Sequence, residues 1–598
     1  MNSSYFIRKI PYLYLFFTLN CCGQGYFQYN PQLLYNDFGS MFEKDSLRDM
    51  YVTFEDFDFH SILVNSFFNN PSFRIPATVS LNGMYFDSVA VRYKGNSTFC
   101  LPHDLGNPKL PFNLDFNEWV SGQKILGYKK IKLANAWLDP TFSKEFTASN
   151  IYRNYLPTPE VNLLKLHVQD DYLGLYVNTE SINKQFLTKH FEEKDGVLFK
   201  CDPAGMFCGE EVEGEPNLHY LGEDSTNYYT SYNLKSDNGG WDKLMELISA
   251  LNFNTAELGE ILNIDRVLWA FAVNTVIANY DTYNGYYVHN YYLYQTEDGL
   301  FQMIPWDLSE SFVGAIMGWS YWNPSDVYEF DPYYGADPIV YEGNTYTRPL
   351  TQYLLNNPLY RKQFTAHMRT VINESLDSDA IYEYVYQLQQ LANDAASQDE
   401  NKLFDMSLFS SNVQDPFWAD WGFGGIVSTV NERKNYLLAH PEISMAPPSI
   451  DNLSVDGNYI TVELVNASQV DLMGTLSEFN SKFIAYPMYD DGLNGDVFPG
   501  DGIYTRMLPE EISHDTEFKF YIRAQNTQAM ALSPERAEYE FYIYSKDLSV
   551  TSFSDYDSNR KLLRIVDLLG RDCKASPNKM LFYIYDDGSV EKVYDLNF

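Results

Sequence analysis

Alternating hydrophobic and polar residues predict a β-hairpin near the middle of the chain. Two short runs, residues 289–294 and 300–306, flank the turn residues Glu297-Asp298-Gly299, and this spacing is typical of two antiparallel strands joined by a tight turn. In an antiparallel pair the start of the first strand lies beside the end of the second. We therefore expect Asn290, which begins the first strand, to meet Asp307, which ends the second, at one edge of the hairpin.

A third polar residue, Asp281, lies just before this hairpin. Three short side chains with oxygen atoms would then converge at one place, which is the kind of site that holds a hard cation such as Mg²⁺ together with phosphate. Asp307 also follows the apolar run at residues 303–306, where a carboxylate needs a partner. The alternative is that each of the three residues only satisfies local backbone groups at a turn or strand end.

Similar patterns predict strands and helices in mixed order before the hairpin. Strands are expected at residues 75–83, 84–94, 109–116 and 129–133, as a hairpin within 163–181, and at 196–200. Helices are expected at about residues 41–50, 139–155, 182–191 and 255–278. Asp139 and Pro140 suit the N-cap and first position of the second of these helices. The 3.6-residue spacing of apolar positions supports the last one, which leads directly to Asp281.

The pattern changes twice after the hairpin. Helices are expected at residues 350–357, 358–374, 378–397 and 427–440, and prolines at 441 and 447–448 then mark a domain boundary. From residue 446 to 544 alternating strands predict an Ig-like β-sandwich. Residues 545–598 form a short β-rich module. The predicted fold class is thus α+β, with an all-β domain and a small β tail at the C-terminal end.

Composition narrows the range of functions. The 598 residues include 45% hydrophobic and 17% aromatic residues, so the chain can build large cores. The formal net charge of -38 argues against nucleic acid as a partner, because nucleic-acid phosphates would be repelled. A nucleotide substrate would need cations to mediate its binding; otherwise the acidity serves solubility.

The N-terminal residues indicate export. Arg8 and Lys9 precede an apolar run at residues 10–19, so residues 1–24 are expected to be a signal peptide. No later stretch is long and apolar enough for a transmembrane helix. Four cysteines remain after the signal, and they do not complete a zinc site. Cys201 and Cys208 are close enough in sequence to pair in an oxidising compartment, but they can equally stay unpaired.

Further polar stretches carry candidate binding residues. The loop Gly95-Asn96-Ser97-Thr98 is of the small-residue kind that cradles phosphate, although an ordinary turn is the alternative. Glu145 lies on a predicted helix, from which it would reach a lysine on a strand or form a solvated surface pair with Lys144. The loop from Asp490 to Asp501 is rich in oxygen ligands for Ca²⁺, but an acidic, glycine-rich turn explains it equally simply.

Several of these segments resemble one protein family, in the same order along the chain. They are GNST at 95–98, LDPTFSKE at 138–145, YLGLYVNTESINKQFL at 172–187, and the segments ANYDTY, HNYYLY and IPWDLSES. Together they resemble the CotH (spore-coat protein H) kinase family, strongly over about residues 75–315 and more weakly to 442. The resemblance implies an atypical protein-kinase fold at residues 25–442, with an N-lobe at about 75–200 and a C-lobe at about 240–442.

The resemblance also implies roles for individual residues. Asp281 would be the catalytic carboxylate, and Asp307 and Asn290 would bind Mg²⁺ or Mn²⁺. The ATP phosphates would be held by groups on the N-lobe side: Glu145, its partner Lys109 or Lys132, and the loop residues Asn96 and Ser97. The chain departs from ordinary kinases, because Asp307 follows Asp281 by 26 residues and no G-x-G-x-x-G loop is present.

The implied function is therefore ATP-dependent phosphorylation of Ser or Thr in a protein substrate, or in the chain itself. The alternative is a non-catalytic surface protein that uses the same fold and the Ig-like domain for adhesion or polymer binding. Residues 545–598 resemble the C-terminal sorting tails of proteins exported by the Bacteroidetes type IX secretion system. Together with the signal peptide, this resemblance implies a secreted or surface-attached protein that engages the type IX machinery.

Overall fold

The computed structural model describes residues 25–35, 39–203, 208, 213–237, 239–314, 327–341, 343–419, 421–512, 517–545, 562–566, 580–585 and 590–594. The chain forms two compact units. The larger unit comprises residues 26–512 and 516–544, and the smaller comprises the two ends of the chain with residues 513–515. The expected signal peptide and Cys573 lie outside the described residues.

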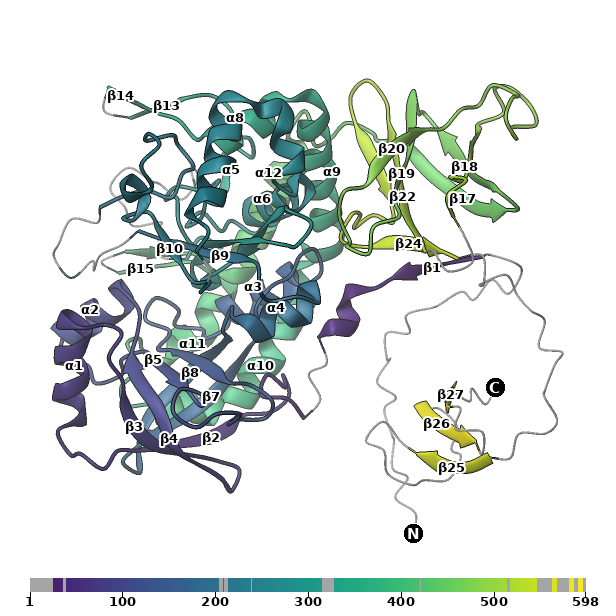
Figure 1. Ribbon diagram of the computed structural model, residues 1–598. Helices are drawn as coiled ribbons and strands as arrows, with labels where there is room; N and C mark the ends of the chain where they lie inside the picture. Colours follow the sequence, from purple (N-terminus) through teal and green to yellow (C-terminus); the bar gives the residue numbers. More distant parts are fainter. Residues whose placement is uncertain are drawn as a thin grey trace, which may run out of the picture. The chain divides into compact units, whose positions relative to one another are not determined.

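A closed barrel forms the first part of the larger unit, drawn in purple to blue in Figure 1. Its strands run in the order β2-β3-β4-β5-β6-β8-β7. Alternate residues of these strands, such as Ile131 and Leu133, fill one apolar core. The strands are β2 (Arg48–Thr53), β3 (Ile75–Leu81), β4 (Met84–Tyr93), β5 (Phe112–Asp115), β6 (Lys130–Ala134), β7 (Val161–Val168) and β8 (Asp171–Glu180).

Four helices accompany the barrel: α1 (Phe59–Asn69), α2 (Ser97–Asp104), α3 (Lys144–Tyr152) and α4 (Lys184–Phe191). The helix expected at residues 41–50 is wrong, because turns occupy residues 39–45 and β2 begins at Arg48. β2 pairs in parallel with β7, with Arg48 opposite Leu164. The segment therefore gains its hydrogen bonds from a distant strand rather than from its own backbone.

A four-stranded sheet follows, in the order β10-β9-β11-β12. The strands are β9 (Val197–Cys201), β10 (Tyr232–Leu234), β11 (Tyr291–Gln295) and β12 (Phe301–Pro305). β11 and β12 form the predicted hairpin, with Tyr291 opposite Pro305. Short elements lie between the larger ones. The 3-10 segments are η1 (Pro31–Leu34), η2 (Ser225–Tyr228), η3 (Thr255–Glu260) and η4 (Leu308–Glu310). Two small strand pairs are β13 (Ile339–Tyr341) with β14 (Asn344–Tyr346), and β15 (Phe417–Trp418) with β16 (Gly422–Phe423).

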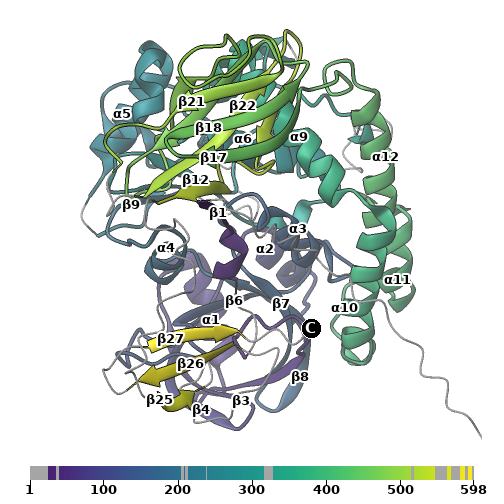
Figure 2. The same ribbon diagram turned by 90° about the vertical axis from the view of Figure 1, so that its right-hand side faces the viewer.

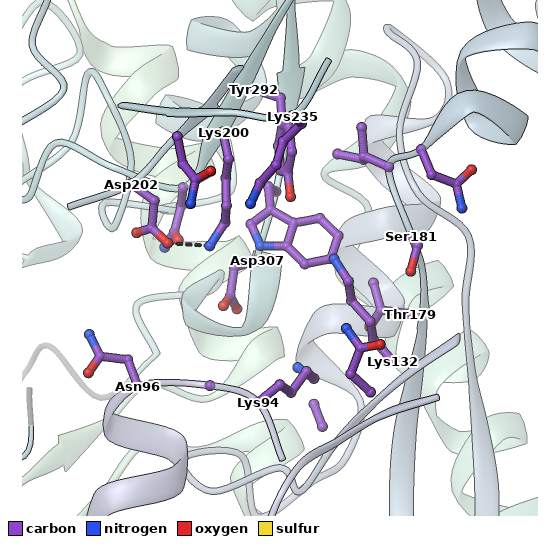
Figure 3. A pocket seen from close by; sticks show the side chains of 18 of the residues that line it. Lys94, Asn96, Lys132, Thr179, Ser181, Lys200, Asp202, Lys235, Tyr292 and Asp307 are labelled. Carbon is purple, nitrogen blue, oxygen red and sulfur yellow. Dashed lines mark hydrogen bonds and ion pairs between the residues drawn. The ribbon is translucent and has the colours of Figure 1, made fainter. Parts of the chain in front are cut away.

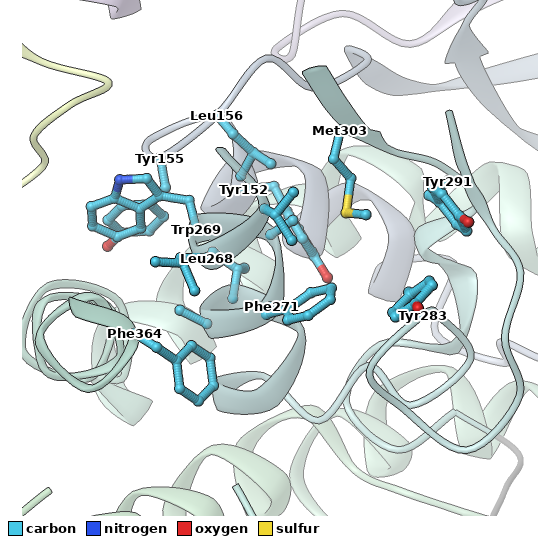
Figure 4. Close-up of a cluster of buried hydrophobic side chains, with 14 of the residues drawn as sticks. Tyr152, Tyr155, Leu156, Leu268, Trp269, Phe271, Tyr283, Tyr291, Met303 and Phe364 are labelled. Atoms are coloured by element: carbon cyan, nitrogen blue, oxygen red, sulfur yellow. The ribbon is translucent and has the colours of Figure 1, made fainter. Parts of the chain in front are cut away.

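Helices pack around this sheet and enclose the largest core of the molecule. They are α5 (Trp241–Phe253), α6 (Ile264–Val276), α8 (Pro349–Asn356), α9 (Pro358–Ser375), α10 (Ser378–Gln398), α11 (Met406–Gln414) and α12 (Ile426–Ala439). α10, α11 and α12 lie side by side in Figure 2. α6 runs through the core, where Trp269 stacks on Tyr155 (Figure 4).

The long helix expected at residues 255–278 is interrupted. It consists of η3 and α6, separated by Leu262, which forms a bridge to Phe301 of β12. The side chain of Asn263 then caps the new helix by accepting a hydrogen bond of 3.0 Å from the backbone N–H of Arg266. A strand contact and a cap therefore override the helical period of the sequence.

Two antiparallel sheets form the C-terminal part of the larger unit and share one core. One contains β17 (Ser449–Asp456), β18 (Tyr459–Val465) and β21 (Ile503–Met507). The other contains β19 (Gln469–Thr475), β20 (Ile484–Pro487), β22 (Phe518–Gln525), β23 (Met530–Ser533), β24 (Phe541–Tyr544) and the N-terminal strand β1 (Tyr26–Tyr29). We call this part the β-unit; its membership of the Ig-like class stays a prediction.

The β-unit contacts the elements that lead to the candidate site. At α6, Trp269 Nε1 donates to the carbonyl oxygen of Ala537 at 3.1 Å, and the N–H of Glu538 donates to Asp265 at 3.1 Å. At the tip of the β11–β12 hairpin, Lys482 Nζ donates to the carbonyl oxygen of Asp298 at 2.7 Å. The β-unit therefore holds both the helix and the hairpin from their far ends.

The expected α+β class is confirmed. In the smaller unit the described residues form one antiparallel sheet of β25 (Leu562–Val566), β26 (Met580–Tyr585) and β27 (Val590–Tyr594), with β26 in the middle. This agrees with a small β-rich module. The division of the first 442 residues into two kinase-like lobes stays a prediction, as does a sorting role for the tail.

Candidate active site

One cleft with a volume of about 740 Å³ lies between the barrel and the four-stranded sheet. Strand alternation turns a polar face of the barrel toward it: Ile131 and Leu133 point into the core, while Lys130 and Lys132 line the cleft. Of the residues predicted from the sequence, those that line this cleft are Asn96, Ser97, Lys132, Glu145, Asp281, Asn290 and Asp307.

The β11–β12 hairpin brings Asn290 and Asp307 to one edge, as its antiparallel pairing requires. The N–H of Trp306, the residue before Asp307, donates to the carbonyl oxygen of Asn290 at 3.2 Å. Asn290 and Asp307 therefore lie close together at the end of the hairpin. Asn290 Nδ2 also donates to the carboxylate of Asp281 at 3.0 Å and to its backbone oxygen at 3.1 Å. The three residues singled out in the sequence therefore lie together.

Asn290, just before β11, and Asp307, shortly after β12, both have a left-handed backbone conformation, with φ of 58° and 52°. Asn and Asp tolerate this region better than most side chains. A residue in it departs sharply from the strand direction. Non-glycine residues held this way cluster at functional sites, and here they occupy the two positions where the hairpin meets the cleft.

The carboxyl group of Asp281 is the most perturbed acid at this edge. Burial raises its pKa to about 6; the charges of Asp307 and Asp202 act in the same direction, whereas His289 opposes them. His289 Nε2 lies 3.4 Å from the Asp281 carboxylate. Asp307 accepts a hydrogen bond of 2.8 Å from the Ser309 hydroxyl.

Glu145 reaches the cleft from α3. Its carboxylate accepts a hydrogen bond of 2.8 Å from the Thr179 hydroxyl. Burial raises its pKa to about 7, the charge of Asp307 adds to this, and Lys94 partly offsets it. Glu145 therefore lies between a basic group of the barrel and the acidic edge of the hairpin.

Basic side chains face these carboxylates (Figure 3). Figure 3 shows Asp307 between Lys94 on one side and Lys200 on the other. Burial lowers the pKa of Lys94, while Asp307 and Glu145 work against that effect. The ammonium group of Lys132 lies 3.7 Å from the centre of the Trp306 ring, and burial followed by the charges of neighbouring cations lowers its pKa well below the usual value.

Several of these residues were not singled out from the sequence: Arg92, Lys94, Lys200, Asp202, Lys235 and His289. A signal for Lys94 exists, because it directly precedes the loop at Gly95 and falls on the same strand face as Arg92. Lys200 is the second-to-last residue of β9 and forms an ion pair with Asp202. Strand parity could have pointed to both lysines once the strands were assigned.

Lys109 lies outside this cleft. Its ammonium group forms a fully buried ion pair with Asp399 at 2.6 Å, just beyond α10, and lies 4.6 Å from the centre of the Phe142 ring. The structure thus does not bring Lys109 to the other predicted residues. It joins the barrel to α10 instead, and we leave it out of the phosphate-binding set.

The loop at residues 95–98 is built into the cleft wall. Gly95 has φ of +96°, and a Cβ atom there would approach Thr98 Oγ1 to 2.4 Å, so the turn requires glycine. Asn135 Nδ2 donates to the carbonyl oxygen of Thr98 at 2.9 Å. The loop leads into α2, with Asn96 at the N-cap position, a helix that the sequence pattern did not indicate.

The cysteines pair differently from the arrangement considered in the sequence. Cys100 of α2 and Cys208 form the disulfide, and Cys201 is a buried free thiol. The Cys201–Cys208 pairing is therefore wrong. Cys201 lies on β9 and belongs to the large apolar core, whereas Cys208 packs against the core of the barrel.

The acidic loop of the β-unit brings three carboxylates together. Oxygen atoms of Asp490, Asp496 and Asp501 lie within 4.8 Å of one another. The loop's own backbone already satisfies much of this charge: Asp490 accepts from the N–H groups of Gly500 at 2.6 Å and Gly502 at 3.0 Å. The expectation of Ca²⁺ stays untested.

Comparisons with known proteins agree on one relationship. A family model described as "CotH kinase protein" matches residues 91–437, which is more than half of the chain. "Inner spore coat protein H" of Bacillus subtilis (strain 168) is 23% identical over 256 residues, which cover 41% of this chain and 64% of that protein. The chain thus spans less than two thirds of that relative.

Among the described residues, no helix combines the length and apolarity needed to cross a membrane.

Proposed function

The chain belongs to the CotH kinase protein family, and from this premise we propose that its cleft transfers the terminal phosphoryl group of ATP to Ser or Thr hydroxyls of a protein. One observation carries the proposal. In a chain with a net charge of -38, clustered carboxylates and several basic side chains that have no ion-pair partner among the described residues line the same cleft. Phosphoryl transfer needs that combination, because cations must neutralise the phosphates while a carboxylate orients the acceptor.

The residues present fit a metal-bound nucleotide. The cleft volume of about 740 Å³ lies in the range of ligand pockets. Asp307 offers carboxylate oxygens, and the side-chain amide of Asn290 would offer its oxygen after a half-turn of the amide group; these are the ligand types that Mg²⁺ and Mn²⁺ prefer. When bound, the metal ion supplies neutralisation of the phosphate charge.

Each residue of the cleft then has a separate task. Lys94 and Lys132, which have no carboxylate within ion-pair distance in the described part of the chain, attract the phosphates. Glu145 acts on Lys94 through its charge, without an ion pair between them, and so favours the charged form of that lysine. Asp281 orients the acceptor hydroxyl and accepts its proton; with a pKa of about 6, its carboxylate is mainly ionised at neutral pH.

The first experiment incubates the protein from residue 25 to 598 with γ-labelled ATP, Mg²⁺ or Mn²⁺, and casein. We expect label on casein or on the protein itself, and we expect Asp281→Asn to lower the rate by at least ~100-fold, the usual contribution of a general base. Asp307→Asn should remove the metal-dependent part of the thermal stabilisation by ATP. Asp195→Asn, on the rim of the same cleft, is the matched control and should change neither result.

The outcomes separate catalysis from binding. Equal labelling by wild type and Asp281→Asn would refute the assignment of that residue. Absence of both label and nucleotide-induced stabilisation would favour the alternative of a non-catalytic surface protein that binds a polymer or another cell.

Export to the cell surface or the medium is part of the same proposal. It is supported by the signal-like residues 1–24 and by the resemblance of residues 545–598 to type IX sorting tails. The disulfide between Cys100 and Cys208 also suits an oxidising compartment. N-terminal sequencing of the exported protein should find a start close to residue 24, and intact Met1 in the medium would contradict a cleaved signal.

A further inference from the structure

Not all cations of the cleft have a partner. Lys130 pairs with Asp115 at 2.7 Å, and Lys200 pairs with Asp202. Within the described residues, the hydrogen bond that Arg92 makes goes to the carbonyl oxygen of its neighbour Tyr93, at 3.0 Å. Across the described residues, no carboxylate lies within ion-pair distance of Arg92 or Lys235, although both line the cleft.

Arg92 and Lys235 stand on opposite walls. Arg92 belongs to β4 of the barrel, where it pairs with Asn113, which in turn pairs with Lys132. Lys235 follows β10 of the four-stranded sheet, two residues beyond Asn233, which pairs with Lys200. Lys235 is exposed and Arg92 is half-buried, so solvent reaches both side chains.

These two cations are also set apart from the acidic edge of the hairpin. The charge of Asp307 acts on Lys94 and Lys200. It is not among the charges that act most strongly on Lys235, whose pKa is lowered to about 8 by the partial desolvation of its ammonium group at the cleft wall and by the charges of Lys200 and Arg92. Asp202 acts both on Lys235 and on Asp281. Lys235 thus shares the neighbour Asp202 with the proposed catalytic carboxylate, whereas the charge of Asp307 is not among the main influences on either Arg92 or Lys235.

We propose that Arg92 and Lys235 form a second anion subsite that receives a carboxylate side chain of the acceptor protein. The acceptor is then acidic around its target Ser or Thr. This inference rests on the proposed function, because it specifies the second substrate of the same cleft.

An acidic acceptor would have to overcome the charge of the whole chain. A net charge of -38 repels an acidic polypeptide at long range. An acidic acceptor can approach only where local cations face outward, and Arg92 and Lys235 provide them from both walls at once. A guanidinium group also matches the planar geometry of a carboxylate.

The test measures binding without catalysis. The probes are fluorescein-labelled peptides of eleven residues in which a central Ala replaces the target Ser and the flanking residues include four Glu or, for comparison, four Gln. Fluorescence anisotropy gives the dissociation constant at low and moderate salt. We expect the Glu peptide to bind more tightly than the Gln peptide, and the difference to shrink as salt is added.

Variants assign the effect to the two cations. Arg92→Gln and Lys235→Gln should each weaken Glu-peptide binding about fivefold, since a partly exposed ion pair contributes up to about 1 kcal/mol. The double variant should abolish the preference for Glu over Gln. Arg92→Lys and Lys235→Arg keep the charge and should retain most of the preference. Lys184→Gln is the control, because Lys184 lines the cleft but already pairs with Asp237 at 3.1 Å.

Thermal stabilisation by Mg-ATP is measured in parallel, so the two hypotheses can fail separately. Unchanged stabilisation together with lost peptide preference supports the subsite. Equal binding of the Glu and Gln peptides, or an unchanged preference in the double variant, overturns it. Weakened ATP stabilisation in the double variant with intact peptide preference also overturns it, because the two cations would then belong to the nucleotide. If Mg-ATP does not raise the thermal stability of the wild-type protein at all, the proposed function itself is refuted.

Discussion

The contact between the β-unit and α6 should make the stability of the protein depend on pH through Glu538. This carboxyl group is buried at the contact and accepts a hydrogen bond of 3.2 Å from the Tyr521 hydroxyl. Burial, and then the charge of Asp265, raises its pKa from 4.5 to about 8. At about 1.4 kcal/mol per pH unit, this shift corresponds to on the order of 5 kcal/mol.

The sign follows from which state binds the proton. Because the folded protein keeps Glu538 protonated to higher pH than the unfolded chain does, stability is complete below about pH 4.5 and is lost as pH rises toward about 8. Glu538→Gln stays neutral and still accepts the hydrogen bond from Tyr521. The variant should therefore match the wild type near pH 5 and exceed it by several kcal/mol at pH 8.

Urea unfolding at pH 5, 6, 7 and 8 measures this difference directly. Comparing the two proteins at each pH cancels the titration of all other groups. Glu510→Gln, an exposed glutamate of the β-unit, is the control and should keep a constant difference from the wild type. A constant difference for Glu538→Gln over the same range would refute the reasoning.

Three other predictions follow from contacts described above. Cys208→Ser removes a cross-link between residues 108 apart and should lower the free energy of unfolding in urea by on the order of 4 kcal/mol, whereas Cys201→Ser should leave the reducing-agent sensitivity of the wild type unchanged. Lys109→Met strands the buried charge of Asp399 and should cost about 3–5 kcal/mol of stability; weaker ATP binding by the folded variant would show that Lys109 does belong to the phosphate site. A chain ending at residue 442 exposes the face of α6 that carries Trp269, so gel filtration should find it aggregated; a stable monomer with a sharp unfolding transition would contradict this.

The candidate site could be predicted where its geometry is local. The hairpin at β11 and β12 follows from a short alternating pattern and a turn, and antiparallel pairing then fixes which residues share an edge. For this reason Asn290 and Asp307 could be placed together before any fold was known. Asp281 follows from the end of α6, which the helical period also indicates.

Elements that depend on distant partners could not be predicted. Residues 41–50 resemble a helix, but β2 is stabilised by β7, more than 110 residues away. The phosphate-binding lysine could not be chosen from the sequence for the same reason, because the choice depends on distant parts of the chain. Lys94 and Lys109 both flank barrel strands, and only the closed barrel shows that one faces the cleft and the other faces Asp399. The partner of Cys208 likewise depends on where α2 packs.

The pairing of β1 with β24 has a consequence for how the protein folds during synthesis or export. β1 contains the first residues of the larger unit and β24 the last, and the side chains of Gln28 and Glu540, which meet there, are 512 residues apart. Closing a loop of that length costs on the order of 5 kcal/mol in chain entropy. A ribosome or export channel that delivers the N-terminus first releases β1 long before its partner exists. Until then its edge is open to other chains, so this seam should close last and set the slowest step of maturation.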